Sequence, residues 1–436
     1  MRRRRAWRLT TGVVLTSLTT VAALVLGAPA GAAESPGSFT GYAFDACTAP
    51  SQAEMNQWLT TSPFWGVGVY IGGSTRQCED QPNLTAGWVA RQSSRGWKVL
   101  PIWVGPQASC TTYPDRISET PGDDYTAARA QGRAEAALAA DAASRLGISS
   151  GSTLWYDLED FDLGSSDDCR RSALSFLSAW TKRLHGLGYA SGIYANVAAA
   201  VHALDYADSV SHGSYAMPDA VWYAWDNGRA DTYIAPRWVR AGSWVGARAH
   251  QYALDTPATY GQLTLTIDRS FMAIGRGSVA PRAPRSCGVQ IDFRRYRTLR
   301  PGDRGAAVTA AQCLLRQKRA YRARIDGRYG RSTDRSVRSF QRSRGLRVTG
   351  RLGASTWTVL LSAGSSPVLK YGSAGHAVRR LQRALNAATQ AELRVTGVFT
   401  ARTATAVRSY QQARRLPRTG VVAADTWAQL EAGHTA

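Results

Sequence analysis

Short strand-like runs alternate with helical stretches between residues 39 and 272, and this alternation limits the possible folds most strongly. The eight runs are FTGYAFD (39–45), GVGVYIG (66–72), KVLPIWV (98–104), TLWYDLE (153–159), YASGIYA (189–195), VWYAW (221–225), ARAHQYA (247–253) and LTLTID (263–268). Amphipathic helical patterns lie between several of them, as at 125–147 and 169–188. Eight strands interleaved with helices over about 235 residues predict an α/β fold, the (β/α)8 TIM-type barrel. A doubly wound open sheet is the alternative, but no glycine-rich phosphate loop follows the first run.

The ends of these runs carry acids and aromatic rings and hardly any basic residues. In a barrel of this type the reacting groups lie at the carboxyl ends of the strands. Glycoside hydrolysis uses such residues, because one acid protonates the leaving oxygen, an anion stabilises the cationic sugar, and flat rings stack on pyranose faces. The predicted catalytic residues are Asp45, Asp157, Glu159 and Asp268. The predicted substrate-binding residues are Tyr70, Trp103, Tyr194, Trp222, Trp225, Gln251 and Tyr252, of which the three tryptophans would serve equally well as barrel packing.

The stretch LWYDLEDFD places four acids directly after a buried run. Residues i and i+2 of a strand share a face, ~6.5–7 Å apart at Cα, so Asp157 and Glu159 should both point into the barrel mouth. Repulsion and partial desolvation raise the pKa of at least one of them, which suits Glu159 as general acid and Asp157 as the anion. Asp160 and Asp162 are expected to be solvated loop acids. A magnesium or calcium site is the alternative, but the spacing is not that of an EF-hand, and we predict neither metal nor cofactor.

Nine motifs of this region follow one another in the order and spacing of a known family. They are GYAFDAC (41–47), GVGVYIGG (66–73), QPNLTAGWV (81–89), GWKVLPIWVGPQASC (96–110), LWYDLED (154–160), FLSAWTKRLHGLGYASGIYAN (176–196), VWYAW (221–225), HQY (250–252) and LTID (265–268). The region resembles the bacterial glycoside-hydrolase-like domain of unknown function 1906, which is similar to the lysozyme-type muramidases of glycoside hydrolase family 25.

The resemblance implies roles for the four acids. In those muramidases an Asp closes the first strand, a D-x-E motif closes a middle strand, and an Asp closes the last. Asp45, Asp157, Glu159 and Asp268 match these positions. The resemblance implies Glu159 as proton donor, with Asp157 assisting the substrate's own N-acetyl group. Related chains usually carry a second acid two residues after the last Asp, whereas this chain has Ser270.

The C-terminal part contains an internal repeat with a period of 70 residues. The stretch LRPGDRGAAVTAAQCLL (299–315) aligns with LKYGSAGHAVRRLQRAL (369–385), and without gaps 22 of the 62 positions from 299 to 360 match those 70 further on. Each copy predicts three helices joined by glycine turns. Both copies resemble the three-helix peptidoglycan-binding domain, in the G..V..LQ..L opening, the V..FQ helix and the T-G-x-x-x-x-x-T-W ending. Asp326 becomes Thr396 in the second copy, so equal binding by the two copies is not implied.

The first 33 residues have the pattern of a secretory signal. A basic start, MRRRRAWRLT, precedes the short apolar run VVLTSLTTVAALVLGA and an Ala-Gly-Ala cleavage site at residues 30–32. The arginine pairs leave either the general or the twin-arginine route open. An uncleaved anchor is the alternative. We predict a secreted protein, extracellular or associated with the cell wall, without stable membrane insertion.

Six cysteines, an even count in an exported chain, predict disulfides. No C-x-x-C pair or Cys/His cluster indicates zinc. With the barrel placement, in which the cysteines trail successive strands on one face, the expected pairs are Cys47–Cys78 and Cys110–Cys169. Cys287–Cys313 would join the linker to the first repeat. The sequence alone permits other connectivities.

Charge is distributed unevenly along the chain. The signal segment carries +5, residues 9–281 carry 18 basic and 24 acidic groups (−6), and residues 282–436 carry 30 basic and 7 acidic groups (+23), which sum to the net +22. Such a cationic part attracts polyanions. For an exported chain these are peptidoglycan and anionic wall polymers. Arginine used only for solubility is the alternative, and nucleic acid is disfavoured because no stacking aromatics are interleaved with the basic residues.

These observations predict five segments. They are a signal peptide (1–33), a glycoside-hydrolase-like barrel (39–274), a linker (275–295) and two peptidoglycan-binding repeats (296–364 and 366–434). The expected function is a secreted, monomeric cell-wall protein that binds peptidoglycan and hydrolyses its glycan strands in the manner of a muramidase. The alternative is a non-catalytic peptidoglycan-binding protein with a degenerate barrel.

Overall fold

The computed structural model describes residues 34–283 and 287–436. The predicted signal peptide falls on residues 1–33, outside the described residues, so that export remains a prediction. Within the two described ranges, no helix combines the length and the apolar character needed to cross a bilayer.

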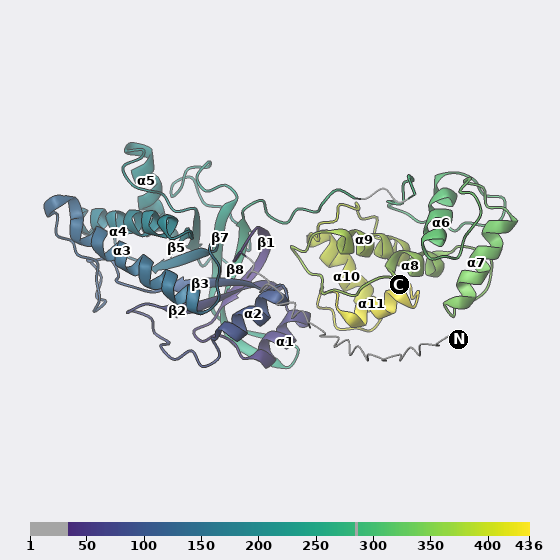
Figure 1. Cartoon of the computed structure of the whole chain (residues 1–436), viewed down its shortest axis with the longest axis horizontal. Helices are drawn as coiled ribbons and strands as arrows, with labels where there is room; N and C mark the ends of the chain where they lie inside the picture. The colour runs from purple at the N-terminus through teal and green to yellow at the C-terminus, as the bar shows by residue number, and fades with distance from the viewer. Residues whose placement is uncertain (1–33, 284–286) are drawn as a thin grey trace, which may run out of the picture. The chain divides into compact units, whose positions relative to one another are not determined.

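Eight strands close into one barrel, each hydrogen-bonded to its neighbours in chain order (Figure 1). They are β1 (Phe39–Asp45), β2 (Phe64–Gly72), β3 (Lys98–Trp103), β4 (Thr153–Leu158), β5 (Ala190–Asn196), β6 (Ala220–Ala224), β7 (Ala247–Tyr260) and β8 (Leu263–Ile274). The helical segments between them are α1 (Gln52–Thr61), α2 (Ala86–Ser94), α3 (Gly122–Arg145), α4 (Asp167–Gly186), the π-helical turn η1 (Val197–Val201) and α5 (His202–Val210). Every predicted run overlaps one strand, which confirms the α/β barrel.

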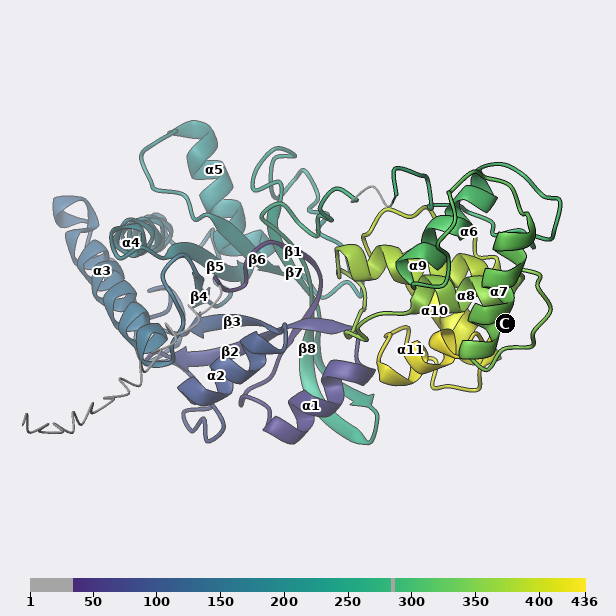
Figure 2. The ribbon, with the colours of Figure 1, turned by 45° about the vertical axis from the view of Figure 1, so that its right-hand side comes forward.

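The last two strands depart from a regular βα repeat. Strands β1 to β7 are parallel in succession, but β8 is antiparallel to both β7 and β1. A two-residue connection joins β7 to β8, which suits a hairpin and is too short for a crossover helix. Asp268 therefore lies in the middle of β8 rather than at its carboxyl end, and it pairs directly with Asp45. In Figure 2 the hairpin of β7 and β8 extends past the shorter strands.

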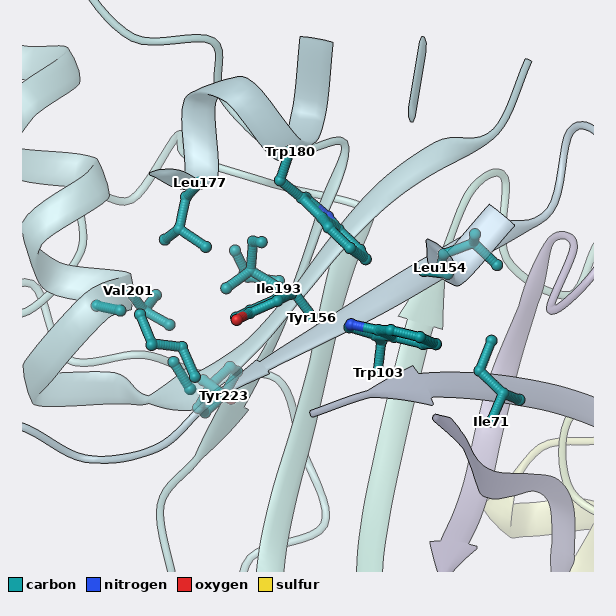
Figure 3. Packing of buried hydrophobic residues seen from close by; sticks show 14 of the residues in the cluster. Ile71, Trp103, Leu154, Tyr156, Leu177, Trp180, Ile193, Val201 and Tyr223 are labelled. Carbon is teal, nitrogen blue, oxygen red and sulfur yellow. The ribbon is translucent and has the colours of Figure 1, made fainter. Parts of the chain in front are cut away.

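Alternate side chains of each strand enter two different apolar layers, as the period of two requires. In β4, Trp155 points into the barrel, where its ring meets that of Trp222 edge to face at 5.6 Å. Tyr156 points outward and packs between Phe176 and Trp180 of α4, at 4.9 Å from each ring. Figure 3 shows this outer layer, with Tyr156 and Trp180 among its labelled residues. The barrel is thus filled by its own side chains below the mouth.

The C-terminal part consists of two three-helix copies. The first copy contains α6 (Ala306–Gln317), α7 (Arg331–Ser343) and α8 (Ala354–Ser362). The second contains α9 (His376–Thr389), α10 (Ala401–Ala413) and α11 (Ala424–Glu431). Corresponding helices begin 70 residues apart, as the repeat predicts, and the two copies share one apolar core.

A buried glutamine fixes the first turn of each copy in the same way. The Gln312 side chain accepts from the Gly327 N–H and donates to the Arg328 carbonyl, at 2.9 and 3.0 Å. Gln382 makes the matching pair with Gly397 and Val398, also at 2.9 and 3.0 Å. Both glycines have positive φ, 69° and 81°, a conformation in which a side chain would be strained. This explains why G and Q recur at these positions of the repeat.

Three disulfides join the cysteines in the expected pairs. They are Cys47–Cys78, Cys110–Cys169 and Cys287–Cys313, with Cα–Cα distances of 5.6, 5.8 and 5.9 Å. The first links the loops that follow β1 and β2, and the second links the loop that follows β3 to the first turn of α4. The third ties the segment before the first repeat to α6.

Candidate active site

A cavity of 420 Å³ lies at the carboxyl-terminal mouth of the barrel. All four predicted catalytic acids line it, together with two of the predicted substrate-binding residues, Tyr70 and Tyr194. They come from β1, β2, β4, β5 and β8 and from the residue that follows β4. The structure thus brings together acids separated by more than 200 positions in the sequence.

Gln251 of β7 connects the two acids of the first and last strands. Its side-chain amide donates to Asp268 at 3.2 Å and approaches the nearer oxygen of Asp45 at 3.4 Å. The Tyr194 hydroxyl donates to the carbonyl oxygen of the same amide at 2.6 Å, which orients it with the NH2 group toward the acids. The Tyr70 hydroxyl approaches Asp45 from the other side at 3.4 Å. Gln251 is buried and does not line the cavity, so it positions the acids from beneath.

Gln107 holds the other pair of acids through their backbone. Its side chain donates to the Asp157 carbonyl at 3.0 Å and accepts from the Glu159 N–H at 2.8 Å. Gln107 is fully buried in the loop after β3, and Cys110, three residues on, is fixed to α4 by its disulfide. The end of β4 is therefore held in place while both carboxyl groups remain directed to the cavity. Within the described residues, one oxygen of Asp157 and one of Asp45 are buried without a hydrogen-bond partner.

Burial dominates the electrostatics of this cluster. It raises the pKa of Asp45 and of Asp157 well above the usual range, with a further increase from Asp268 and from Glu159 respectively. Burial also raises the pKa of Glu159, which Asp160 raises further, and that of Asp268, where the Asp255 N–H opposes the increase. Several carboxyls confined together cannot all ionise at low cost. The cluster can therefore keep a carboxylic acid protonated near neutral pH.

Besides Gln251, four other predicted substrate-binding residues lie outside this lining. Trp222 is fully buried inside the barrel below the mouth, where its N–H donates to Ser270 at 3.0 Å. Trp103 points outward among the apolar side chains seen in Figure 3, and its N–H donates to Glu135 of α3 at 2.6 Å. Tyr252 contacts the outward-facing His250. Their side chains therefore give no support to a direct contact with substrate.

Trp225 belongs to a second cavity beside the first. This cavity has a volume of 340 Å³, and Leu254 lines both cavities. Trp238 lies in the same lining, so two indole rings flank a hollow next to the acids. The stacking role of Trp225 stays a prediction.

Loops supply several lining residues that strand-end reasoning missed. Arg76, Tyr113 and Asp255 lie in segments between strands or at an irregularity in β7. Arg76 stays at the rim because its guanidinium donates to the carbonyls of Tyr70 and Glu79, at 3.3 and 2.6 Å. The sequence feature that could have located these loops is the pair Cys47 and Cys78, because a disulfide on the predicted catalytic face holds loops over the site.

The remaining acids of the region behave as expected. Asp160 and Asp162 are exposed, as predicted for loop acids. Ser270, where an acid is usual in related chains, is buried and accepts from Trp222. Among the described residues, no group of three or more His, Cys, Asp or Glu side chains has the arrangement of a metal site.

A closed barrel with carboxyl groups gathered at its mouth, followed by two helical repeats, defines a glycoside hydrolase-like protein with appended binding modules. Residues 56–272 match the family model of the Rv2525c-like, glycoside hydrolase-like domain. Residues 304–360 and 374–430 each match the putative peptidoglycan binding domain. The chain therefore carries an Rv2525c-like glycoside hydrolase-like domain followed by two peptidoglycan binding domains.

Several solved structures are similar to portions of this chain. An uncharacterised protein of B. stearothermophilus is 22% identical, with a TM-score of 0.36, over 54% of this chain and 96% of that one. The Tat-secreted protein Rv2525c of Mycobacterium tuberculosis is 14% identical, with a TM-score of 0.36, over 54% of this chain and 97% of that one. The endolysin of Burkholderia phage AP3 is 44% identical over 16% of this chain and 26% of that one, with a TM-score of 0.15. A comparison with curated proteins gives no match.

Proposed function

We propose that this chain is a secreted cell-wall protein that hydrolyses the glycan strands of peptidoglycan with its barrel and is held on that polymer by its two repeats. One observation carries the catalytic part, namely the convergence of Asp45, Asp157, Glu159 and Asp268 in one cavity where burial raises the pKa of each. The peptidoglycan binding domains supply the substrate class. The disulfides fit an oxidising compartment outside the cytoplasm.

Glu159 is assigned as the proton donor. Both residues line the cavity, but Glu159 is half-buried whereas Asp157 is buried, so Glu159 is the better placed of the two to reach a glycosidic oxygen. Its raised pKa keeps the proton available. In the bond-breaking step the proton passes from Glu159 to the leaving oxygen as the bond between that oxygen and the anomeric carbon breaks.

Asp157 is assigned to the substrate's N-acetyl group. The acetamido oxygen attacks the anomeric carbon, and the Asp157 carboxyl group accepts the amide N–H. The positive charge that develops on the resulting ring favours the ionised form of Asp157 and opposes the elevation of its pKa by burial. Water then attacks the anomeric carbon as the bond between that carbon and the acetamido oxygen breaks, and it gives its proton to the Glu159 carboxylate, which restores the acid and the acetamido group. Asp45 and Asp268, held by Gln251, bind the sugar from the opposite wall.

A specific observation favours a second candidate, a non-catalytic wall protein. Ser270 replaces an acid that related chains usually carry, and its hydroxyl is used to hold Trp222. In this case the cavity would bind glycan without cutting it, and the repeats would keep their role.

Reducing-end release from purified peptidoglycan separates the two candidates. The measurement compares residues 34–436 with Glu159→Gln, Asp157→Asn and, as a control, Asp162→Asn, because Asp162 is an exposed acid of the same segment outside the cavity. Hydrolysis by the wild type and by Asp162→Asn, lost in the other two variants while wall binding persists, supports the hydrolase. Tight wall binding with no release by the wild type leaves the second candidate.

A further inference from the structure

The second repeat contains a groove that is separate from the barrel and includes part of the turn held by Gln382. It has a volume of 770 Å³ and lies between the segment after α9 and the first half of α10. Arg394 and Arg402 line it from the repeat itself, and Arg294 lines it from the segment that precedes the first repeat. Three arginine residues thus line one hollow.

Their charge is not neutralised within the protein. Among the described residues, no ion pair involves Arg294, Arg394 or Arg402. The one acid in the lining, Glu392, accepts instead from the neighbouring Arg295 at 2.7 Å. The groove therefore keeps an excess of positive charge that an anionic ligand can satisfy.

Arg294 is carried to the groove by an arm, residues 292–295, that is fixed on the second repeat. Asp292 pairs with Arg383 of α9 at 2.6 Å. The buried amide of Asn386 donates to the Phe293 carbonyl at 2.9 Å. With the Arg295–Glu392 pair, three interactions hold four consecutive residues of the arm. The groove is thus a composite of two segments about 100 positions apart in the sequence, which a single repeat could not form.

The first copy differs at the positions that shape this groove. Tyr321 replaces Ala391 and puts a larger, buried ring at this position, with its hydroxyl donating to the Arg324 carbonyl at 2.7 Å. Ser332 replaces Arg402, which removes one cation.

Asp326 replaces Thr396 and adds a negative charge. Its carboxylate accepts from the Arg328 N–H at 2.9 Å and from the Gln312 amide at 2.8 Å. The first of these hydrogen bonds contributes most to the lowered pKa of Asp326, so the group is ionised at neutral pH. An anion entering the first copy would therefore meet a carboxylate, where the second copy offers a neutral hydroxyl.

We propose that the groove of the second repeat binds the carboxylates of the peptide stem of peptidoglycan, and that the first copy lacks this site. The inference rests on the proposed function, in which the repeats bind peptidoglycan. The free carboxylates of the stem are the anionic groups of that polymer, whereas its amino sugars are neutral. A guanidinium forms two parallel hydrogen bonds with a carboxylate, so three arginines suit a stem that carries several such groups.

The test measures binding of the disaccharide-tetrapeptide of peptidoglycan to the full mature chain by calorimetry. Arg394→Ala and Arg402→Ala should each weaken binding about tenfold. Thr396→Asp should weaken it at least as much, because it adds a carboxylate that repels the ligand. The first copy carries Asp at this position, so the fold should tolerate the substitution. The matched control is Arg324→Ala, the counterpart of Arg394 in the first copy, which should change the Kd less than about twofold. A disaccharide-tetrapeptide with amidated carboxyls should bind about tenfold more weakly than the unmodified ligand.

Other results would each contradict one part of the proposal. Equal losses for Arg324→Ala and Arg394→Ala would show that the copies are equivalent. Unchanged binding of the amidated ligand would exclude the carboxylates, and stronger competition by polyglycerol phosphate than by the stem peptide would assign the groove to phosphate. If the wild type binds neither the fragment nor whole peptidoglycan, the proposed role of the repeats fails. If it binds whole peptidoglycan and none of the groove variants alters that binding, only the groove assignment fails.

Discussion

The cavity of the barrel and the groove of the second repeat place charged groups in opposite environments. The acids Asp45 and Asp157 are 2% and 4% exposed, and burial raises the pKa of both. The arginines of the groove, Arg394 and Arg402, are exposed. Proton transfer benefits from a desolvated acid, because desolvation brings its pKa toward the working pH. Attachment to a polymer benefits from solvated cations, which bind and release without a large desolvation cost.

The largest expected effect is the separation of the two regions by single substitutions. Glu159→Gln should lower glycan hydrolysis by about 10²–10⁴-fold, because the proton donor is lost, while binding to peptidoglycan stays within about twofold. Arg402→Ala should have the reverse effect. It should weaken binding to walls and leave the hydrolysis of soluble glycan fragments unchanged. The readouts are reducing-end release and sedimentation with purified walls. If Glu159→Gln weakened wall binding as strongly as hydrolysis, the two regions would not be independent.

Next in size is the pH dependence of barrel stability. The folded-state pKa of Asp45 and Asp157 is raised above the unfolded value, so their contribution is fully present below the unfolded pKa, about 4, and is lost as pH rises through the raised folded pKa. Each unit of elevation corresponds to about 1.4 kcal/mol. The temperature of the unfolding midpoint should therefore decrease as the pH is raised from acidic to mildly alkaline values. Asp45→Asn should make this decrease smaller. Calorimetric scans across that range measure it, and an equal slope in the variant would contradict the stated burial effect.

The repeats should respond to salt where the barrel does not. Screening shortens the range of exposed charges from about 14 Å at 0.05 M to about 4 Å at 0.5 M salt, so wall binding should weaken several-fold over this range. Hydrolysis of a neutral glycan fragment should stay nearly constant, since the acids are shielded from ions by burial. Binding isotherms at a series of salt concentrations test this. Wall binding that is independent of salt would rule out the electrostatic contribution of the arginines.

The smallest effect is expected for the hydrogen bond between Trp222 and Ser270 inside the barrel. Ser270→Ala removes the acceptor of the buried Trp222 N–H, which should cost about 1–2 kcal/mol of unfolding free energy. Ser270→Thr keeps a hydroxyl and serves as the control for hydrogen bonding, although it adds a methyl group. Denaturant unfolding measures both. A loss of hydrolysis in Ser270→Ala that is larger than the loss of folded protein explains would give the contact between Trp222 and Ser270 a role in positioning the acids.

Local sequence was sufficient for the order of the elements and for the identity of the acids. Strands β1 to β6 lie within about two residues of the predicted runs, because period-two patterning and flanking turn residues are properties of a few neighbours. The prediction stopped at residues 253 and 268 and missed the remaining parts of β7 and β8. Residues 254–260 of β7 pair with 263–267 of β8 and bury few side chains, whereas residues 269–274 of β8 are largely buried and pair with β1 and with residues 247–253 of β7. Asp268 was still found, although it lies in mid-strand opposite Asp45.

Whether a side chain points into or out of the barrel predicted the site residues better than a position at the end of a strand. Tyr70, Asp157 and Gln251 point inward and join the cluster. Trp103 and Tyr252 directly follow inward-facing residues and therefore point outward. Alternation along each strand already contains this information, provided that one inward residue per strand is known. Trp222 faces inward as well, but it lies too deep to reach the cavity.

The sequence by itself determined the repeat, the acids available for chemistry, the number of cysteines and the alternation of strands and helices. These depend on composition and on short-range periodicity. Tertiary structure alone decided that Gln251 bridges Asp45 and Asp268, that Gln107 fixes the end of β4, and that the arm bearing Arg294 completes a groove on the second repeat. Such contacts join residues that are dozens to hundreds of positions apart. Their formation depends on how the barrel closes and where the arm packs, which no local pattern encodes.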